Sequence, residues 1–266
     1  MKAGFIGAGK MAEAMMASLL HAKVFEAHEI FACDLSEERR SLIKKSLGVN
    51  VYSATSPFIE SVDILILAVK PQDLEPVLKN IAPKIGPNHL VVSIAAGRRI
   101  AWLESRLPGA RIVRVMPNLP CQVSEGMSAY CLGALAKPAD AQTTESLLTS
   151  FGKVLRLPED LFDAVTALSG SGPAFFVFFM EKMVEAGILE GLSREDALLL
   201  CEQTMMGTSR LLLTTRQDPR QLIQAVASAK GTTAAGLAVF EKSNLDAIVG
   251  SAVKAAADRS REMADS

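Results

Sequence analysis

The stretch that decides the fold is Lys2–Ala12, which reads KAGFIGAGKMA. A short apolar run ends in this stretch at Gly7, and a helix-forming sequence begins after Gly9. With Ala12, these two glycines fill the Gly-x-Gly-x-x-Gly/Ala pattern that joins a strand to a helix in dinucleotide-binding folds. The glycines allow a tight turn and close approach of the backbone to a pyrophosphate, which the N–H groups of the helix start would bind. The residues that we therefore expect at the cofactor are Gly7, Gly9, Lys10 and Met11.

The first 158 residues alternate short apolar runs with amphipathic stretches, which is typical of βαβ units. The predicted strands are residues 2–7, 29–33, 49–52, 64–69, 90–95, 112–116, 129–132 and 154–157. The run Leu65–Val69 is apolar at every position, which indicates a strand covered on both faces. We therefore predict an α/β Rossmann-type domain over residues 1–158, with a doubly wound, mostly parallel sheet.

After Pro158 the pattern predicts only helices. They are residues 160–187, 193–215, 219–227, 233–241 and 245–263. Ser193 places a capping side chain at the start of one of them. The helices carry more apolar residues than a thin layer over a sheet would need. We therefore predict an all-α domain over residues 159–266 that pairs with a second copy of the chain.

Composition excludes several classes of protein. The 28 basic and 29 acidic side chains contain no run of like charge, so we expect no nucleic-acid partner. The longest run of large apolar side chains, Ala174–Met180, is too short to span a bilayer, so we expect no membrane segment and a cytoplasmic protein. The four cysteines lie far apart, which predicts neither a metal site nor a disulfide framework.

The end of the second predicted strand bears on the choice of cofactor. Asp34 lies where an acidic residue binds the ribose hydroxyls of NAD, whereas Ser36 and Arg39 could hold the 2'-phosphate of NADP. Arg39 and Arg40 could equally form a solvated helix face. The predicted cofactor is therefore NADPH or NADH, with a slight preference for NADPH.

Ligands of doubly wound sheets bind beyond the carboxyl ends of the strands. Three loops lie there, at Val69–Gln72, Ala95–Gly97 and Arg114–Pro120. Lys70 is either a catalytic ammonium or a residue that orients its loop, and we favour the second role. Asn118 offers an amide to a carboxamide or a ribose.

Two segments of the helical region, Ser169–Pro173 and Gly231–Thr233, are predicted to precede helices. Each would present backbone N–H groups to a carboxylate. Ser171 does not form the nucleophile elbow of a hydrolase, because that motif needs glycine two residues on either side. The three histidines lie beside no glycine loop, and we interpret them as surface or core residues.

Six blocks together resemble the pyrroline-5-carboxylate reductase family, in order and over essentially the whole chain. They are Gly4–Gly9 with Met11–Ala12, Ala68–Pro71, Ser93–Gly97, Arg114–Asn118, Leu168–Ala174 and Gly231–Thr233. The resemblance implies a Rossmann domain followed by a helical domain that interlocks with a partner chain, as a homodimer or a ring of dimers. It also implies reduction of a cyclic imino acid, 1-pyrroline-5-carboxylate, to L-proline by hydride transfer from NADPH or NADH.

The resemblance also assigns residues. It implies that the nicotinamide side is lined by Val69, Lys70, Pro71, Ala95 and Asn118. The backbone of Ser228, Gly231 and Thr232 would hold the substrate carboxylate. The Thr233 hydroxyl would meet the ring nitrogen, which makes Thr233 the predicted catalytic residue. A protonated imine is already electrophilic, so positioning of the hydride is expected to provide most of the catalysis.

The chain departs from the family pattern in the substrate loop. Where the family usually has Ser-Pro-Gly-Gly-Thr-Thr, Ser228–Thr233 reads SAKGTT. Lys230 could be solvated, could reach the substrate carboxylate, or could indicate a different imino acid. Ile223–Gln224 and Leu119 also replace common family residues. The alternatives are therefore a reductase of a related cyclic imine or keto acid, and a non-catalytic nucleotide-binding regulator.

Overall fold

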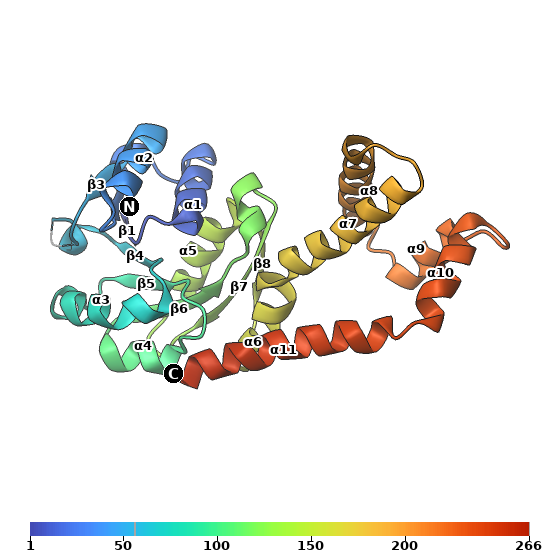
Figure 1. Ribbon diagram of the computed structural model, residues 1–266. Coiled ribbons are helices and arrows are strands. Elements are labelled where there is room, and N and C mark those ends of the chain that lie inside the picture. Colours follow the sequence, from blue (N-terminus) through green and yellow to red (C-terminus); the bar gives the residue numbers. More distant parts are fainter. Residues whose placement is uncertain (56, 266) are drawn as a thin grey trace. The chain divides into compact units, whose positions relative to one another are not determined.

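The computed structural model of the protein describes residues 1–55 and 57–265. The chain divides into two compact units (Figure 1). The first comprises Met1–Ser171 with Ala255–Ser266, and the second comprises Gly172–Lys254. Each unit is described by itself below.

The first unit is built on one sheet of eight strands in the order β3-β2-β1-β4-β5-β6-β7-β8. The strands are β1 (Ala3–Ile6), β2 (Ile30–Cys33), β3 (Asn50–Tyr52), β4 (Ile64–Leu67), β5 (Leu90–Ser93), β6 (Arg111–Met116), β7 (Gly126–Leu132) and β8 (Gly152–Arg156). Neighbouring strands are parallel except β6 and β7, which are antiparallel. The predicted doubly wound, mostly parallel sheet is confirmed, with a strand in each of the predicted places.

Helices cover both faces of this sheet (Figure 1). They are α1 (Lys10–His21), α2 (Glu37–Leu47), α3 (Leu74–Ile81), α4 (Ile100–Arg106) and α5 (Pro138–Thr149). Ile64 and Ile66 of β4 pack in the core layer of α1, α2 and α5, whereas Leu65 and Leu67 pack in the layer of α3 and α4. Alternate side chains of a strand point to opposite faces, so the continuous apolar run of β4 follows from burial on both sides.

A continuous helical stretch follows the sheet. It comprises a 3-10 turn (Glu159–Leu161), α6 (Phe162–Val165), a π-helical turn (Thr166–Gly170) and α7 (Gly172–Leu189). By length and composition alone, Glu159–Leu189 is apolar enough to cross a membrane, and 22% of its most apolar window is buried. The expectation that no segment could span a bilayer came from the shorter run Ala174–Met180, and it missed this longer stretch.

The second unit is helical throughout its described residues. It holds α7, α8 (Arg194–Thr215), α9 (Pro219–Val226), α10 (Thr232–Lys242) and the first half of α11 (Leu245–Asp265). The Ser193 hydroxyl accepts a hydrogen bond from Asp196 N at 3.0 Å, as the sequence predicts for the start of α8. Many large apolar side chains of this unit are exposed, among them Phe176 and Phe178 of α7.

Candidate functional site

The strand order reverses at β1, which pairs with β2 on one side and with β4 on the other. Gly7 follows β1 with φ +96°, a conformation that favours glycine. A Cβ added to Gly7 would lie 2.7 Å from the carbonyl oxygen of Ala68, just after β4. The backbones therefore approach closely at the place where open α/β sheets bind ligands.

A cavity of about 650 Å³ lies beside the close approach of Gly7 and Ala68. It is lined by five of the predicted cofactor residues, namely Gly7, Gly9, Asp34, Val69 and Lys70. Other lining residues come from the segment after β3 and from α3, among them Thr55 and Asn80. The structure thus brings together residues from the ends of β1, β2 and β4 that are up to 63 positions apart in the sequence.

The start of α1 fits a phosphate group. Gly9 is the residue before the helix, and no side chain among the described residues caps its first turn. The first N–H groups of a helix, here those of Lys10 and Met11, have no acceptor within the helix. A Cβ added to Gly9 would meet nothing within 4 Å, so the space in front of the loop is open. The predicted pyrophosphate site is thus consistent with the local geometry.

The predicted ribose and 2'-phosphate residues form a hydrogen-bonded group around the glycine loop. The Asp34 carboxylate accepts from Ala8 N at 2.8 Å and from Ser36 N at 2.9 Å. The Ser36 hydroxyl accepts from Arg39 N at 3.3 Å and caps α2. The Arg39 guanidinium donates to the Ala8 carbonyl and to Glu13. Sequence reasoning missed Glu13 as a partner of Arg39. Its place in the first turn of α1, close behind the glycine loop, is the signal that could have indicated it.

The remaining predicted nicotinamide residues do not line this cavity. Pro71 begins the 3-10 turn Pro71–Asp73, and Ala95 is buried. The Asn118 side chain is engaged within the protein, because Oδ1 accepts from Met127 N at 2.8 Å and Nδ2 donates to Ser169. Asn118 therefore ties the loop after β6 to the π-helical turn.

The C-terminal end of α11 lies against another predicted loop. A Cβ on Gly97 would come within 2.9 Å of the Met263 Cβ. Ser260 is buried, and its hydroxyl donates to Asp163 at 2.7 Å. The last turns of the chain thus support the loop that carries Ala95, which the sequence did not indicate.

The predicted substrate loop lies in the second unit. Gly231 N donates to the Ser228 carbonyl at 2.9 Å, which closes a four-residue turn, and Lys230 has φ +61° in this turn. The turn leads into α10, whose first residues are Thr232 and Thr233. Their N–H groups lie at a helix N-terminus, where a carboxylate is stabilised. Thr233 is half-buried.

One expected anion site is wrong. Ser169–Pro173 was expected to precede a helix and to offer free N–H groups, but it lies inside the continuous helical stretch. Ser171 N donates to the Thr166 carbonyl at 2.8 Å, across five residues. Gly170 is the last residue of a π-helical turn, a feature often found at functional sites, and Gly172 begins α7.

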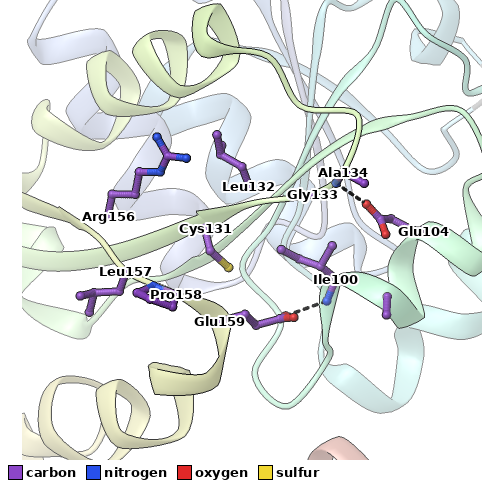
Figure 2. A pocket seen from close by; sticks show the side chains of 11 residues that line it. Ile100, Glu104, Cys131, Leu132, Gly133, Ala134, Arg156, Leu157, Pro158 and Glu159 are labelled. Atoms are coloured by element: carbon purple, nitrogen blue, oxygen red, sulfur yellow. Dashed lines mark hydrogen bonds between the residues drawn. The ribbon is translucent and has the colours of Figure 1, made fainter.

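A second cavity, of about 610 Å³, lies between α4 and the strands β7 and β8 (Figure 2). Its two carboxylates are occupied by backbone groups, since Glu104 accepts from Ala134 N and Glu159 accepts from Ile100 N, both at 2.7 Å. Burial, with a smaller contribution from nearby Glu159, raises the pKa of the Cys131 thiol to about 12. A protonated thiol is a poor nucleophile, and no predicted site residue lines this cavity.

Nucleophilic and metal chemistry find little support at the first cavity either. Cys33 lines it, but burial and then the Asp34 charge raise the pKa of its thiol to about 11. Among the described residues, no group of three or more His, Cys, Asp or Glu side chains is placed to hold a metal ion. The Cys33 thiol is therefore a poor nucleophile.

Known proteins resemble this chain over its full length. The family model "Pyrroline-5-carboxylate reductase dimerisation" matches residues 159–263, and "NADP oxidoreductase coenzyme F420-dependent" matches residues 2–97. The pyrroline-5-carboxylate reductase of Methanosarcina acetivorans is 40% identical, over 98% of this chain and 97% of the relative. That of Arabidopsis thaliana is 38% identical, over 100% and 96%.

Solved structures agree. A pyrroline-5-carboxylate reductase from Coxiella burnetii superposes with a TM-score of 0.92 at 32% identity, and 98% of each chain is covered. The Plasmodium falciparum pyrroline carboxylate reductase, solved with NADP bound, gives a TM-score of 0.89 at 33% identity, over 99% of this chain and 98% of the other. The fold, the glycine loop and these relatives lead to one conclusion: the chain belongs to the pyrroline-5-carboxylate reductase family.

Proposed function

We propose that the protein reduces 1-pyrroline-5-carboxylate to L-proline with a hydride from NADPH or NADH, the last step of proline biosynthesis. Full-length relatives that are named pyrroline-5-carboxylate reductase and are 38–40% identical to this chain support the reaction. The observation that carries the proposal is the open glycine loop after β1, where the strand order of the sheet reverses, since this loop fits the dinucleotide that the reaction needs.

The chain's own groups then have distinct roles. Gly7 and Gly9 shape the loop, and the N–H groups of Lys10 and Met11 bind the pyrophosphate. Asp34, with Ser36 beside it, meets the adenine-side ribose. The nicotinamide side is formed by Val69, Lys70, Pro71, Ala95 and Asn118. The reduced nicotinamide supplies the hydride when it is bound.

The substrate loop positions the imine. The turn Ser228–Gly231 and the N-terminus of α10 hold the substrate carboxylate through backbone N–H groups. The Thr233 hydroxyl contacts the ring nitrogen and keeps the imine carbon directed toward the hydride donor. A hydroxyl is a weak acid, so Thr233 orients the protonated imine and relays protons through water.

The helical region pairs with a second copy. The family dimerisation match over residues 159–263 supports an oligomer, and the exposed apolar side chains of α7 and α8 give it a surface to bury. We take the assembly to be a homodimer that can form a ring of dimers, in the cytoplasm, without membrane or nucleic-acid partners. In this division residues 1–158 bind the dinucleotide and residues 159–266 bind substrate and the partner chain.

The test is oxidation of NADPH and NADH by purified protein with 1-pyrroline-5-carboxylate, followed at the absorbance band of the reduced nicotinamide. We expect Thr233→Ala to lower kcat about 10²-fold, because it removes a group that orients the reacting atoms. The matched control is Thr149→Ala, an exposed threonine of α5 outside both sites, which should keep wild-type kinetics.

Two results would contradict the proposal. No oxidation with either cofactor, despite measurable nucleotide binding, would exclude this reaction and favour a non-catalytic regulator. Faster oxidation with a six-membered cyclic imino acid would move the assignment to a related substrate. Lys230, which replaces the usual glycine of the substrate loop, is the residue that would then be tested first.

A further inference from the structure

Arg39 is held on the glycine loop by three hydrogen bonds. Its Nε and Nη2 atoms donate to the Ala8 carbonyl at 2.8 and 2.6 Å, and Nη2 also donates to Glu13 Oε2 at 2.7 Å. The Arg39 and Glu13 side chains are only 24% and 31% exposed, so solvent screens their ion pair only in part. The charged end of Arg39 is thus neutralised by Glu13 and directed at the loop backbone.

These contacts fix the orientation of a peptide plane. In a trans peptide the carbonyl and the N–H point in opposite directions. Because Arg39 holds the carbonyl of the Ala8–Gly9 peptide, the Gly9 N–H points away from Arg39. The preceding peptide is fixed as well, because Asp34 accepts from Ala8 N at 2.8 Å. Two successive planes of the loop are therefore set by side chains that follow β2.

The loop needs such support because its own sequence is permissive. Ala8 lies between two glycines, and a peptide next to a glycine flips at low steric cost. A flip of the Ala8–Gly9 plane would turn a carbonyl oxygen where an N–H is required, and this oxygen would repel a pyrophosphate.

We propose that Arg39 is a positioning residue for the pyrophosphate loop, acting with Glu13, and that it does not read the 2'-phosphate of NADP. This inference rests on the proposed dinucleotide site but not on the reaction. It predicts that Arg39 matters equally for NAD and NADP, because both carry the same pyrophosphate.

The experiment measures the Kd of NAD⁺ and of NADP⁺ by calorimetry for the wild type, Arg39→Ala, Arg39→Lys and Glu13→Gln. We expect Arg39→Ala to raise both Kd values by the same factor, about tenfold, the order of one charge-assisted hydrogen bond. Arg39→Lys should not rescue binding, because an ammonium lacks the planar fork that spans the Ala8 carbonyl and Glu13. Glu13→Gln should raise both values by a smaller common factor.

A residue that binds the 2'-phosphate of NADP would behave differently. Arg39→Ala would then raise only the Kd of NADP⁺, Arg39→Lys would keep most of the binding, and Glu13→Gln would lower the Kd of NADP⁺ by freeing the guanidinium. Any of these results, or unchanged Kd values in Arg39→Ala, overturns the proposal. Arg156→Ala, an exposed arginine outside the cofactor cavity, is the matched control, and thermal melting confirms that each variant is folded.

Kinetics add a second readout. If the wild type reduces the imine, kcat at saturating cofactor should be nearly unchanged in Arg39→Ala, while KM rises by the same factor for both cofactors. A fall in kcat without a change in KM contradicts positioning of the loop. If the wild type shows no turnover, the proposed reaction fails, and the calorimetric comparison still decides the role of Arg39.

Discussion

At the residue scale, Gly7 and Gly9 of the cofactor loop are glycines for different reasons. Gly7 has φ +96° and lies against the Ala68 carbonyl, so any side chain would collide with backbone. Gly9 has no neighbour within 4 Å of an added Cβ, so a side chain there would fill only the space that a ligand needs. Gly7 is therefore required by the fold, whereas we propose that Gly9 is required by nucleotide binding.

This difference predicts opposite behaviour on substitution by alanine. We expect Gly7→Ala to lower the free energy of unfolding by about 2 kcal/mol or more, through strain and overpacking. Gly9→Ala should leave the melting temperature nearly unchanged and weaken nucleotide binding at least tenfold. Gly86→Ala, where an added Cβ also meets nothing within 4 Å, is the control and should change neither. Wild-type nucleotide affinity in Gly9→Ala would contradict the phosphate site.

Lys230 shows a similar conflict between backbone and side chain. The turn Ser228–Gly231 has the positive φ at its third residue, where type II turns prefer glycine, with proline preferred at the second. The usual family pattern Ser-Pro-Gly-Gly satisfies both preferences, whereas this chain has Ala229 and Lys230. The turn is therefore kept here despite an unfavourable sequence.

We expect Lys230→Gly to raise the free energy of unfolding by up to about 1 kcal/mol, because it relieves a left-handed conformation in a residue with a Cβ. Lys230→Ala retains the Cβ and removes only the ammonium, so it separates charge from strain. An unchanged KM for the imine in both variants indicates a solvated lysine, whereas an increase in both indicates contact with the substrate. Destabilisation by Lys230→Gly in chemical denaturation would contradict the strain.

At the element scale, the strands were predictable because burial on both faces leaves a continuous apolar run. The strand ends were less predictable. The apolar run predicted β4 over residues 64–69, but the strand ends at Leu67, and Ala68 then lies against Gly7 of the cofactor loop. Helix starts were predictable where a capping side chain marks them, as Ser193 does for α8. Both signals depend on residues that are adjacent in the sequence, so a single sequence is enough to find them.

The π-helical turn was not predictable in the same way. Its sequence, TALSG, contains the glycine that suggested a break before a new helix, yet the backbone continues through one wide turn. The Asn118 amide, 51 positions away, contacts Ser169 in this turn. Pairings such as Arg39 with Ala8 and Glu13 likewise depend on how two βα units pack, so single-sequence patterns identify the candidate residues but not their partners.

At the scale of the whole molecule, the apolar helical stretch Glu159–Leu189 has two possible neighbours, a second copy of the chain or a lipid bilayer. We expect a second copy, because the family dimerisation match begins at residue 159. Phe176 and Phe178 are 62% and 68% exposed within the chain, and partner burial would remove this apolar surface from water.

The double substitution of Phe176 and Phe178 by aspartate should therefore shift the protein from dimer or higher oligomer to monomer in light scattering coupled to gel filtration. Leu135→Asp, an exposed leucine of the first unit, is the matched control and should leave the oligomer intact. Because two buried charges cost several kcal/mol at an apolar interface, the effect should persist at micromolar concentration. If the wild type instead floats with liposomes and the aspartates abolish flotation without changing the molecular mass, the stretch binds lipid and the proposed dimer surface is wrong.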